Sequence, residues 1–182
     1  DYFIKDFDIE VFLDSNSEIS NYIYDRIISK KKLTFHNPVD VSDLLNLIES
    51  IDFGIFIDSG PLHVAKVLNK SGVLITSSVS EKVLLHKFSN IKPIQNYYQS
   101  KYCSGPCGLV NAFNLDNSNG CYDSLMVDKL SILKKENYKN LQRGSLKKNY
   151  LNLYNKTVGC FRNYNIEDII IFIKNTIKGK VN

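Results

Sequence analysis

The sequence lacks the segments that would take the chain into or across a membrane. It has no run of about 18 apolar residues, so no transmembrane helix is expected. We also expect no secretory leader. Its four cysteines are therefore expected to be reduced thiols in a cytoplasm.

Arginine is scarce, and this limits the partners that the sequence suggests. Only Arg26, Arg143 and Arg162 occur, so the net charge of +4 is carried mainly by lysine. No arginine cluster or basic run interleaved with aromatic residues is present, and nucleic acid is not an expected partner. The lysine excess indicates a solvated surface, with a phosphate-bearing ligand or an anionic membrane face as alternatives.

The composition is that of a folded chain. Hydrophobic residues make up 43% of the 182 positions, which is enough to build a core. The length suits one α/β domain, and we expect a single domain over 1–182. The chain does not begin with Met, and residues 1–7 resemble the tail of an amphipathic helix. We therefore expect it to continue a longer protein.

Strand and helix patterns alternate over the first half of the chain. Strands are expected at 8–13, 33–35, 53–57 and 73–76, the last two buried on both faces, and helices at 17–29, 40–51 and 61–69. This order predicts a Rossmann-like α/β fold with a mostly parallel sheet flanked by helices. Beyond it we expect an irregular Cys-containing loop at 95–121, a helix at 127–133, a polar excursion at 134–157 and a C-terminal helix at 165–178.

The most informative segment is Asp-Ser-Gly-Pro-Leu-His-Val-Ala at 58–65. A buried strand ends in Asp58, Ser59 can cap a helix, and Gly60 removes a side chain where a ligand must approach the backbone. The first helical turn then offers free N–H groups at its positive end, and His63 can add a donor. By itself such a tetrapeptide more often makes only a well-formed helix start, but the strand–turn–helix context favours an anion site.

This segment resembles the Asp-Thr/Ser-Gly-x-x-His-x-Ala signature of the heptosyltransferase family (glycosyltransferase family 9). The resemblance extends to the residues before this segment (40–57), to those after it (65–74) and to the Cys-containing segment at 160–169. The resemblance implies the C-terminal, donor-binding half of a GT-B fold, with the N-terminal acceptor domain and the catalytic base absent from this chain. We therefore expect this chain alone to bind donor weakly and not to turn over.

The resemblance also implies roles for particular residues. Asp58 would contact the donor sugar, while Ser59, Gly60 and His63 would hold the diphosphate. Glu18 follows the strand expected at 8–13, where the family places an acidic residue for the nucleoside. A solvated glutamate at a helix start explains Glu18 equally well.

The loop after the strand at 73–76 departs from the family. The family usually has a glycine-containing loop there, whereas this chain has Thr-Ser-Ser-Val-Ser at 76–80. The hydroxyls of Ser77 and Ser78 can still bind phosphate or sugar. This departure leaves the donor unidentified.

The cysteines at 103, 107, 121 and 160 leave three alternatives open. A zinc site is disfavoured, because three residues separate the first pair and the other two cysteines are isolated. A structural pair clasping the long loop agrees better with the family, which often carries cysteines here. Buried thiols are the third alternative. We therefore expect no cofactor and no metal.

The resulting functional hypothesis is that this chain is half of an enzyme that transfers a sugar. If the resemblance extends to the substrate, that sugar is heptose. The donor would be a nucleotide-diphosphate sugar, and the acceptor a bacterial surface glycan or a glycolipid of lipopolysaccharide biosynthesis. The protein would be cytoplasmic, at the inner face of the inner membrane if it associates peripherally. The alternatives are a non-catalytic nucleotide-binding module and a Cys-rich interaction module on the same fold.

Overall fold

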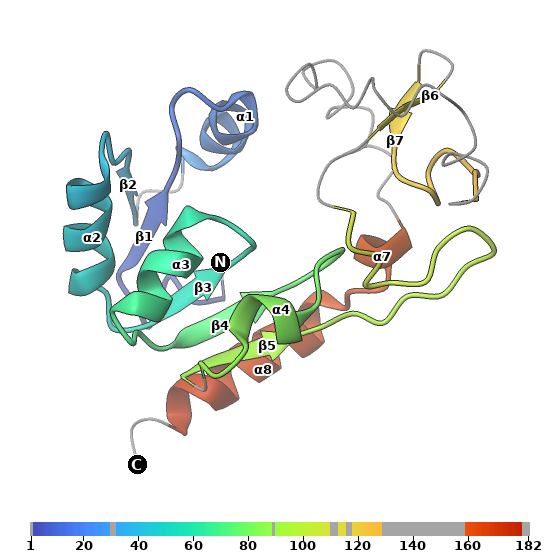
Figure 1. The fold of residues 1–182 in the computed structure, drawn as a ribbon. Helices are drawn as coiled ribbons and strands as arrows, with labels where there is room; N and C mark the ends of the chain where they lie inside the picture. Colours follow the sequence, from blue (N-terminus) through green and yellow to red (C-terminus); the bar gives the residue numbers. More distant parts are fainter. Residues whose placement is uncertain are drawn as a thin grey trace. The chain divides into compact units, whose positions relative to one another are not determined.

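A computed structural model describes residues 2–29, 32–88, 90–109, 113–115, 118–128 and 159–179 (Figure 1). The chain divides into two compact units, Asp1–Asp52 and Phe53–Asn182. Both have the α/β character that the sequence predicts, with short parallel sheets beside helices.

The first unit is a βα repeat. Strands β1 (Ile9–Phe12) and β2 (Leu33–His36) pair in parallel, and helix α1 (Glu18–Ile27) connects them. Tyr24 of α1 packs edge-on against Phe35 of β2, with ring centroids 4.9 Å apart. Helix α2 (Val41–Ser50) follows, and the Asp40 side chain caps it by accepting from the Asp43 amide at 2.8 Å. The predicted cap at Asp40 is therefore confirmed.

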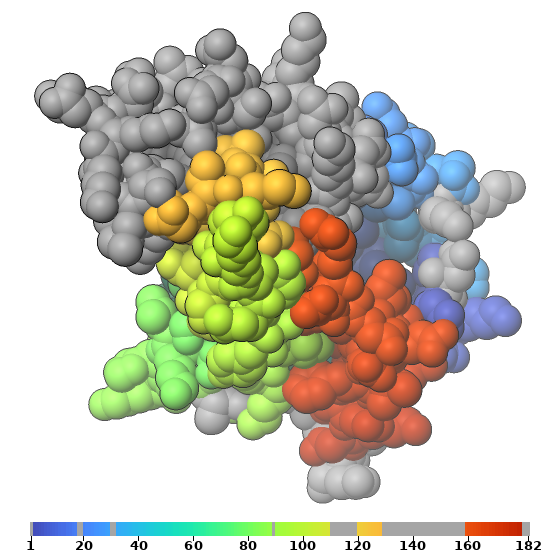
Figure 2. Space-filling view, turned by 90° about the vertical axis from the view of Figure 1, so that its right-hand side faces the viewer, coloured from blue at the N-terminus to red at the C-terminus, as the bar shows by residue number. Residues whose placement is uncertain are grey.

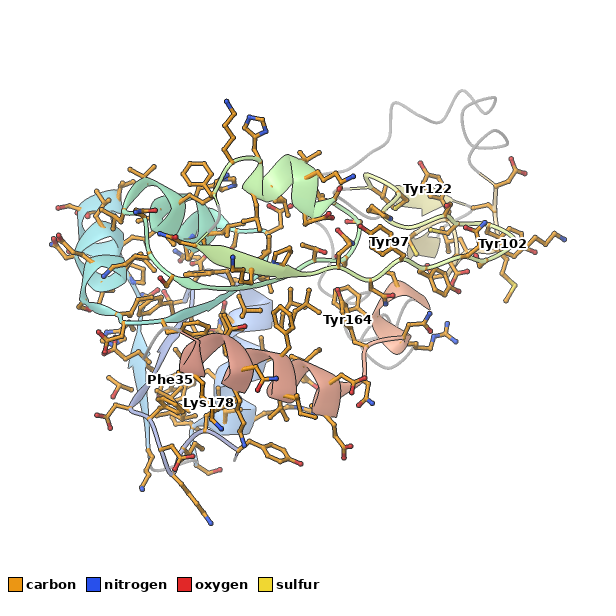
Figure 3. The ribbon with its side chains drawn as sticks, turned by 90° about the horizontal axis from the view of Figure 1, so that it is seen from below. Phe35, Tyr97, Tyr102, Tyr122, Tyr164 and Lys178 are labelled. Atoms are coloured by element: carbon orange, nitrogen blue, oxygen red, sulfur yellow. The ribbon has the colours of Figure 1, made fainter. Side chains whose placement is uncertain are left out.

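The second unit is built on the parallel sheet β3–β4–β5. Its strands are β3 (Gly54–Phe56), β4 (Gly72–Ile75) and β5 (Ile91–Ile94), joined by helices α3 (Gly60–Val67) and α4 (Glu81–Leu85). Helices α3 and α4 lie on one face, and helix α8 (Ile166–Lys178) covers the other face at β4 (Figure 3). The buried apolar residues of this unit come from these elements: Phe56, Leu62, Ala65, Val73, Leu74, Leu84, Leu85, Ile91 and Ile173.

The central strand and the edge strand differ in burial. Gly72, Val73 and Leu74 of β4 are all buried, as predicted for a strand covered on both faces. The same prediction is wrong for β3, where Ile55 is 53% exposed. Strand β3 is the edge of its sheet, and α8 packs on β4 instead. Only the face of β3 that carries Phe56 is therefore covered.

The C-terminal helix agrees with its predicted range of 165–178, and Asn165 caps it by accepting from the Glu167 amide at 3.0 Å. The segment predicted as an irregular loop contains the antiparallel strands β6 (Phe113–Leu115) and β7 (Ser118–Gly120). The short helix α7 (Gly159–Arg162) was not predicted. The excursion at 134–157 and nearly all of the helix predicted at 127–133 lie outside the described residues.

Candidate functional site

Apart from Glu18, the predicted ligand-binding residues lie at the carboxyl end of the strands in the second unit's sheet. Strands β3 and β4 are parallel neighbours, with Phe56 opposite Leu74. The chain therefore leaves both strands at the same end of the sheet, which is the end formed by the carboxyl ends of the strands. Asp58, Ser59 and Gly60 follow β3, while Ser77 and Ser78 follow β4. We call Asp58, Ser59, Gly60, His63, Ser77 and Ser78 the sheet-edge site. Ligands of open α/β sheets bind at this edge.

The start of α3 is left uncapped by its own side chains. Ser59 occupies the cap position, but its hydroxyl donates to the Ile57 carbonyl at 3.2 Å and caps no amide of the helix. Ser59 therefore occupies the predicted N-cap position, but its side chain does not make the capping hydrogen bond. Among the described residues, none accepts a hydrogen bond from the Gly60 amide. The positive end of α3 thus has an unused donor.

The surroundings of this helix start are open. A methyl group at Gly60 would meet no atom within 4 Å, and the side chains of Asp58 and His63 are exposed. The first turn contains no acidic residue that could satisfy the helix dipole. Asp58 precedes the turn, and its negative charge suits sugar hydroxyls better than a phosphate.

The second part of the site, the loop at 76–80, is held firmly. Thr76 is only 2% exposed, and its amide donates to the Ile94 carbonyl at 3.1 Å. The Tyr164 hydroxyl donates to the carbonyls of Thr76 and Ile94, the latter at 3.0 Å. The Gly108 amide donates to the Ser78 carbonyl at 2.7 Å. The loop that would meet the ligand is therefore anchored by residues from two distant segments.

Neither anchor was predicted from the sequence. Tyr164 lies between α7 and α8, beside the sheet in Figure 3. Gly108 follows Cys107 and adopts a left-handed backbone with φ of 75°, which glycine tolerates best. Nothing in the sequence around Tyr164 or Gly108 indicates contacts with residues so distant along the chain. Tyr164 merely precedes a capped helix, and Gly108 merely follows a cysteine.

The four cysteines lie on three segments that the structure joins. We call residues 95–109, 118–128 and 159–164 the thiol lobe; they lie side by side in Figures 1 and 2. The side-chain amide of Asn96 donates to the Cys160 carbonyl, and the Tyr98 hydroxyl donates to the Asp123 carboxylate at 3.2 Å. The Tyr98 ring also lies directly against Gly159, where any side chain would collide with it.

The thiols themselves are close enough to influence one another. Burial raises the pKa of Cys103 to about 12, and a hydrogen bond with Cys107 and the nearby Cys121 and Cys160 add to the shift. Burial likewise raises the pKa of Cys160 to about 11, with contributions from Cys121 and Cys107. All four are free thiols. Over the described part of the chain, no three His, Cys, Asp or Glu side chains are positioned around a common point as metal ligands.

Glu18 is the one predicted site residue that belongs to the first unit. It begins α1, directly after the Ser17 cap, but its side chain lies outside the described residues. Its role toward the nucleoside stays a prediction.

Comparisons with protein-family models, curated proteins and solved structures find no match to this chain. None of the described helices combines the length and apolar character needed to cross a membrane.

Proposed function

We propose that this chain binds a nucleotide-diphosphate sugar at the sheet-edge site, as the donor-binding part of a glycosyltransferase acting on a bacterial surface glycan or glycolipid. One observation carries the proposal: the start of α3, at the carboxyl end of β3, is open, has no side-chain cap and has no acidic residue in its first turn. A phosphate bound there would accept from the Gly60 amide and interact favourably with the helix dipole.

The chemistry of sugar transfer fits this arrangement. When the sugar leaves, negative charge develops on the nucleoside diphosphate, and preorganised donors lower the barrier by stabilising that charge. The Gly60 amide and the exposed His63 can supply such donors. Asp58 can accept from sugar hydroxyls, and Ser77 and Ser78 can donate to either group from the neighbouring loop. No described residue is assigned as the base that activates the acceptor hydroxyl.

The test is calorimetric titration with a panel of nucleoside diphosphates, comparing the wild-type chain with His63→Ala. We expect at least one diphosphate to bind, and its dissociation constant to rise about tenfold in the variant, since a hydrogen bond to a charged group contributes about 1.5–3 kcal/mol. The matching nucleoside should bind more weakly than its diphosphate, because it lacks the phosphates.

His86→Asn is the matched control. His86 is also exposed, but it lies after α4 and is not part of the sheet-edge site. The His86→Asn variant should bind the diphosphate with the same affinity as the wild type. If no diphosphate binds, or if both variants lose affinity equally, the proposal is wrong. Binding without transfer in a protein that also holds the acceptor domain would favour the non-catalytic module.

A further inference from the structure

Basic charge is concentrated in the part of the chain that builds helices α3 and α4. Between Asp58 and Asp116 the sequence has six lysines and a single acidic residue, Glu81. Residues 1–52, by contrast, have eleven acidic and five basic residues. Such a separation of charge along one chain indicates a surface that meets a partner of the opposite sign.

Three of these lysines are each followed directly by an exposed apolar residue. The pairs are Lys66-Val67, Lys82-Val83 and Lys87-Phe88, and we call these six residues the basic face. Val67 is 78% exposed, Val83 is 71% exposed and Phe88 is 40% exposed. A single exposed valine is ordinary, but three exposed apolar side chains beside three lysines form an amphipathic surface.

The structure brings the three pairs together. The Lys66 ammonium donates to the Leu84 carbonyl and lies 4.9 Å from the centre of the Phe88 ring. The last turn of α3 therefore lies beside α4 and the turn that follows it. Asn90 joins the same regions, because its side chain donates to the Asn69 side chain at 2.7 Å. Both helices lie on one face of the sheet (Figure 3).

Helix α4 presents its charged side to solvent. Its two buried residues are leucines, and Lys82 and Val83 lie on the opposite, exposed side of the helix. Among the described residues, neither Lys82 nor Lys87 forms an ion pair with a carboxylate. Glu81 precedes Lys82 and offsets one positive charge, so the basic face keeps a net positive charge.

We propose that the basic face is a docking surface for a membrane that contains anionic phospholipids. The lysine ammonium groups would lie among the lipid phosphates, while Val67, Val83 and Phe88 would enter the boundary with the acyl chains. Nucleic acid fits these six residues less well. Their charge comes from lysine rather than arginine, and Phe88 is the single aromatic side chain on which a base could stack.

The basic face is separate from the start of α3. Val67 lies seven residues beyond Gly60 in the same helix, which corresponds to about 10 Å along the helix axis. Membrane docking at the basic face therefore requires no nucleotide at the sheet-edge site.

Helix α8, on the other face of the sheet, is the natural comparison. It also exposes apolar side chains, Ile166 and Ile171 among them. Its first turn, however, contains Glu167 and Asp168, and an anionic membrane would repel both carboxylates. Apolar exposure alone therefore does not distinguish the two faces, whereas the sign of the charge beside it does.

The experiment is sedimentation of the whole 182-residue chain with lipid vesicles, without nucleotide. We expect binding to vesicles of phosphatidylglycerol and phosphatidylcholine in equal parts, and at least about tenfold weaker binding to phosphatidylcholine alone. Binding to the anionic vesicles should fall about tenfold or more in 1 M salt, where the Debye length is about 3 Å.

Two charge-reversed variants locate the surface. Lys82→Glu together with Lys87→Glu should weaken binding to anionic vesicles at least about 25-fold, because each lysine near such a surface contributes about fivefold. The matched control is Lys174→Glu together with Lys178→Glu, which changes the net charge equally but on α8. It should bind within about threefold of the wild type.

The apolar contribution is tested separately. Val67→Ser together with Val83→Ser should weaken vesicle binding about tenfold, because the two valines would no longer enter the apolar part of the membrane. Ile171→Ser on α8 is the control and should bind like the wild type. Circular dichroism of each variant separates loss of docking from loss of the fold.

Equal binding to anionic and neutral vesicles would overturn the docking surface, and so would equal losses in the two charge-reversed variants. Tighter binding to duplex DNA than to anionic vesicles would also overturn it, since it would show a nucleic-acid surface. Calorimetry of Lys82→Glu with Lys87→Glu should find wild-type nucleotide affinity. The docking surface and the donor site can therefore fail independently.

Discussion

At the scale of single residues, a substitution at Gly60 can distinguish a ligand-binding role of this residue from a structural one. Its backbone is not left-handed and no atom lies within 4 Å of a methyl group placed there, so Gly60→Ala fits without strain. Alanine favours a helix over glycine by about 0.5–1 kcal/mol, so the melting temperature should stay the same or rise. The methyl group would nevertheless occupy the space that a phosphate needs, and diphosphate affinity should fall about tenfold or more.

Gly179→Ala provides the control for this change. Gly179 ends α8 with φ of −67°, and a methyl group there makes only ordinary contact with the Asn175 carbonyl. Calorimetry should find wild-type affinity. Unchanged nucleotide affinity in Gly60→Ala would mean that no ligand approaches this turn.

The second residue-scale prediction concerns the reactivity of the free thiol of Cys103. The thiolate is the reactive form, and the pKa of Cys103 is raised from 9.0 to about 12. At pH 8 its thiolate fraction is therefore reduced, and alkylation should be at least about tenfold slower than for a cysteine in an unfolded peptide. The rate should rise steadily with pH, because deprotonation continues above pH 9. Mass spectrometry of the alkylated peptides measures both rates, and equal rates at pH 8 would contradict the prediction.

At the scale of elements, Tyr164 joins the ends of two strands to the α7–α8 connection. Its hydroxyl donates to the carbonyls of Thr76 and Ile94. Thr76 directly follows β4, and Ile94 is the last residue of β5. Tyr164→Phe leaves these half-buried carbonyls without that donor, and the free energy of unfolding should fall by about 1–2 kcal/mol. Urea denaturation measures the change.

Tyr97→Phe is the matched comparison for Tyr164→Phe. Tyr97 is 68% exposed, and its hydroxyl makes only a long contact of 3.4 Å with Glu81. Its removal should change the free energy of unfolding by less than about 0.5 kcal/mol. If the two variants were equally stable, Tyr164 would not hold the strand ends together.

At the scale of the whole molecule, the sheet-edge site and the thiol lobe are connected through the loop at 76–80. Gly108, next to Cys107, donates to the Ser78 carbonyl, and Tyr164 follows Cys160 by one helical turn and donates to Thr76. Tyr164→Phe should therefore also weaken diphosphate binding severalfold, because it releases one anchor of this loop. Calorimetry with the variant measures the change, and full nucleotide affinity would show that the site does not depend on the lobe.

Much of the second unit's scaffold was predictable from local patterns. The Ser-Gly-Pro start predicted α3, apolar spacing predicted α8, and continuous apolar runs predicted β3 and β4. Helix α4 was missed because five residues are too few to show a helical period, and β5 was missed because it contains Pro93. Proline is confined to edge strands, and β5 is an edge of this sheet.

Local sequence patterns were sufficient to predict the α/β character, the start of α3 after β3 and the residues that lie at that helix start. All of these depend on neighbours within a few positions, where periodicity and capping chemistry act. Three features appear only in the folded chain: the Ser59 hydroxyl turns away from the helix, Ile55 is exposed, and Tyr164 and Gly108 hold the loop at 76–80.

The folded chain also brings the four cysteines, spread over three segments, close enough to influence one another. Spacing along the chain did not predict this proximity, because Cys121 and Cys160 are isolated in the sequence. Cys121 and Cys160 reach the first pair only because the folded chain brings β7 and α7 beside the segment that follows β5. No local pattern encodes such a contact, since its energy comes from groups that are neighbours only after folding.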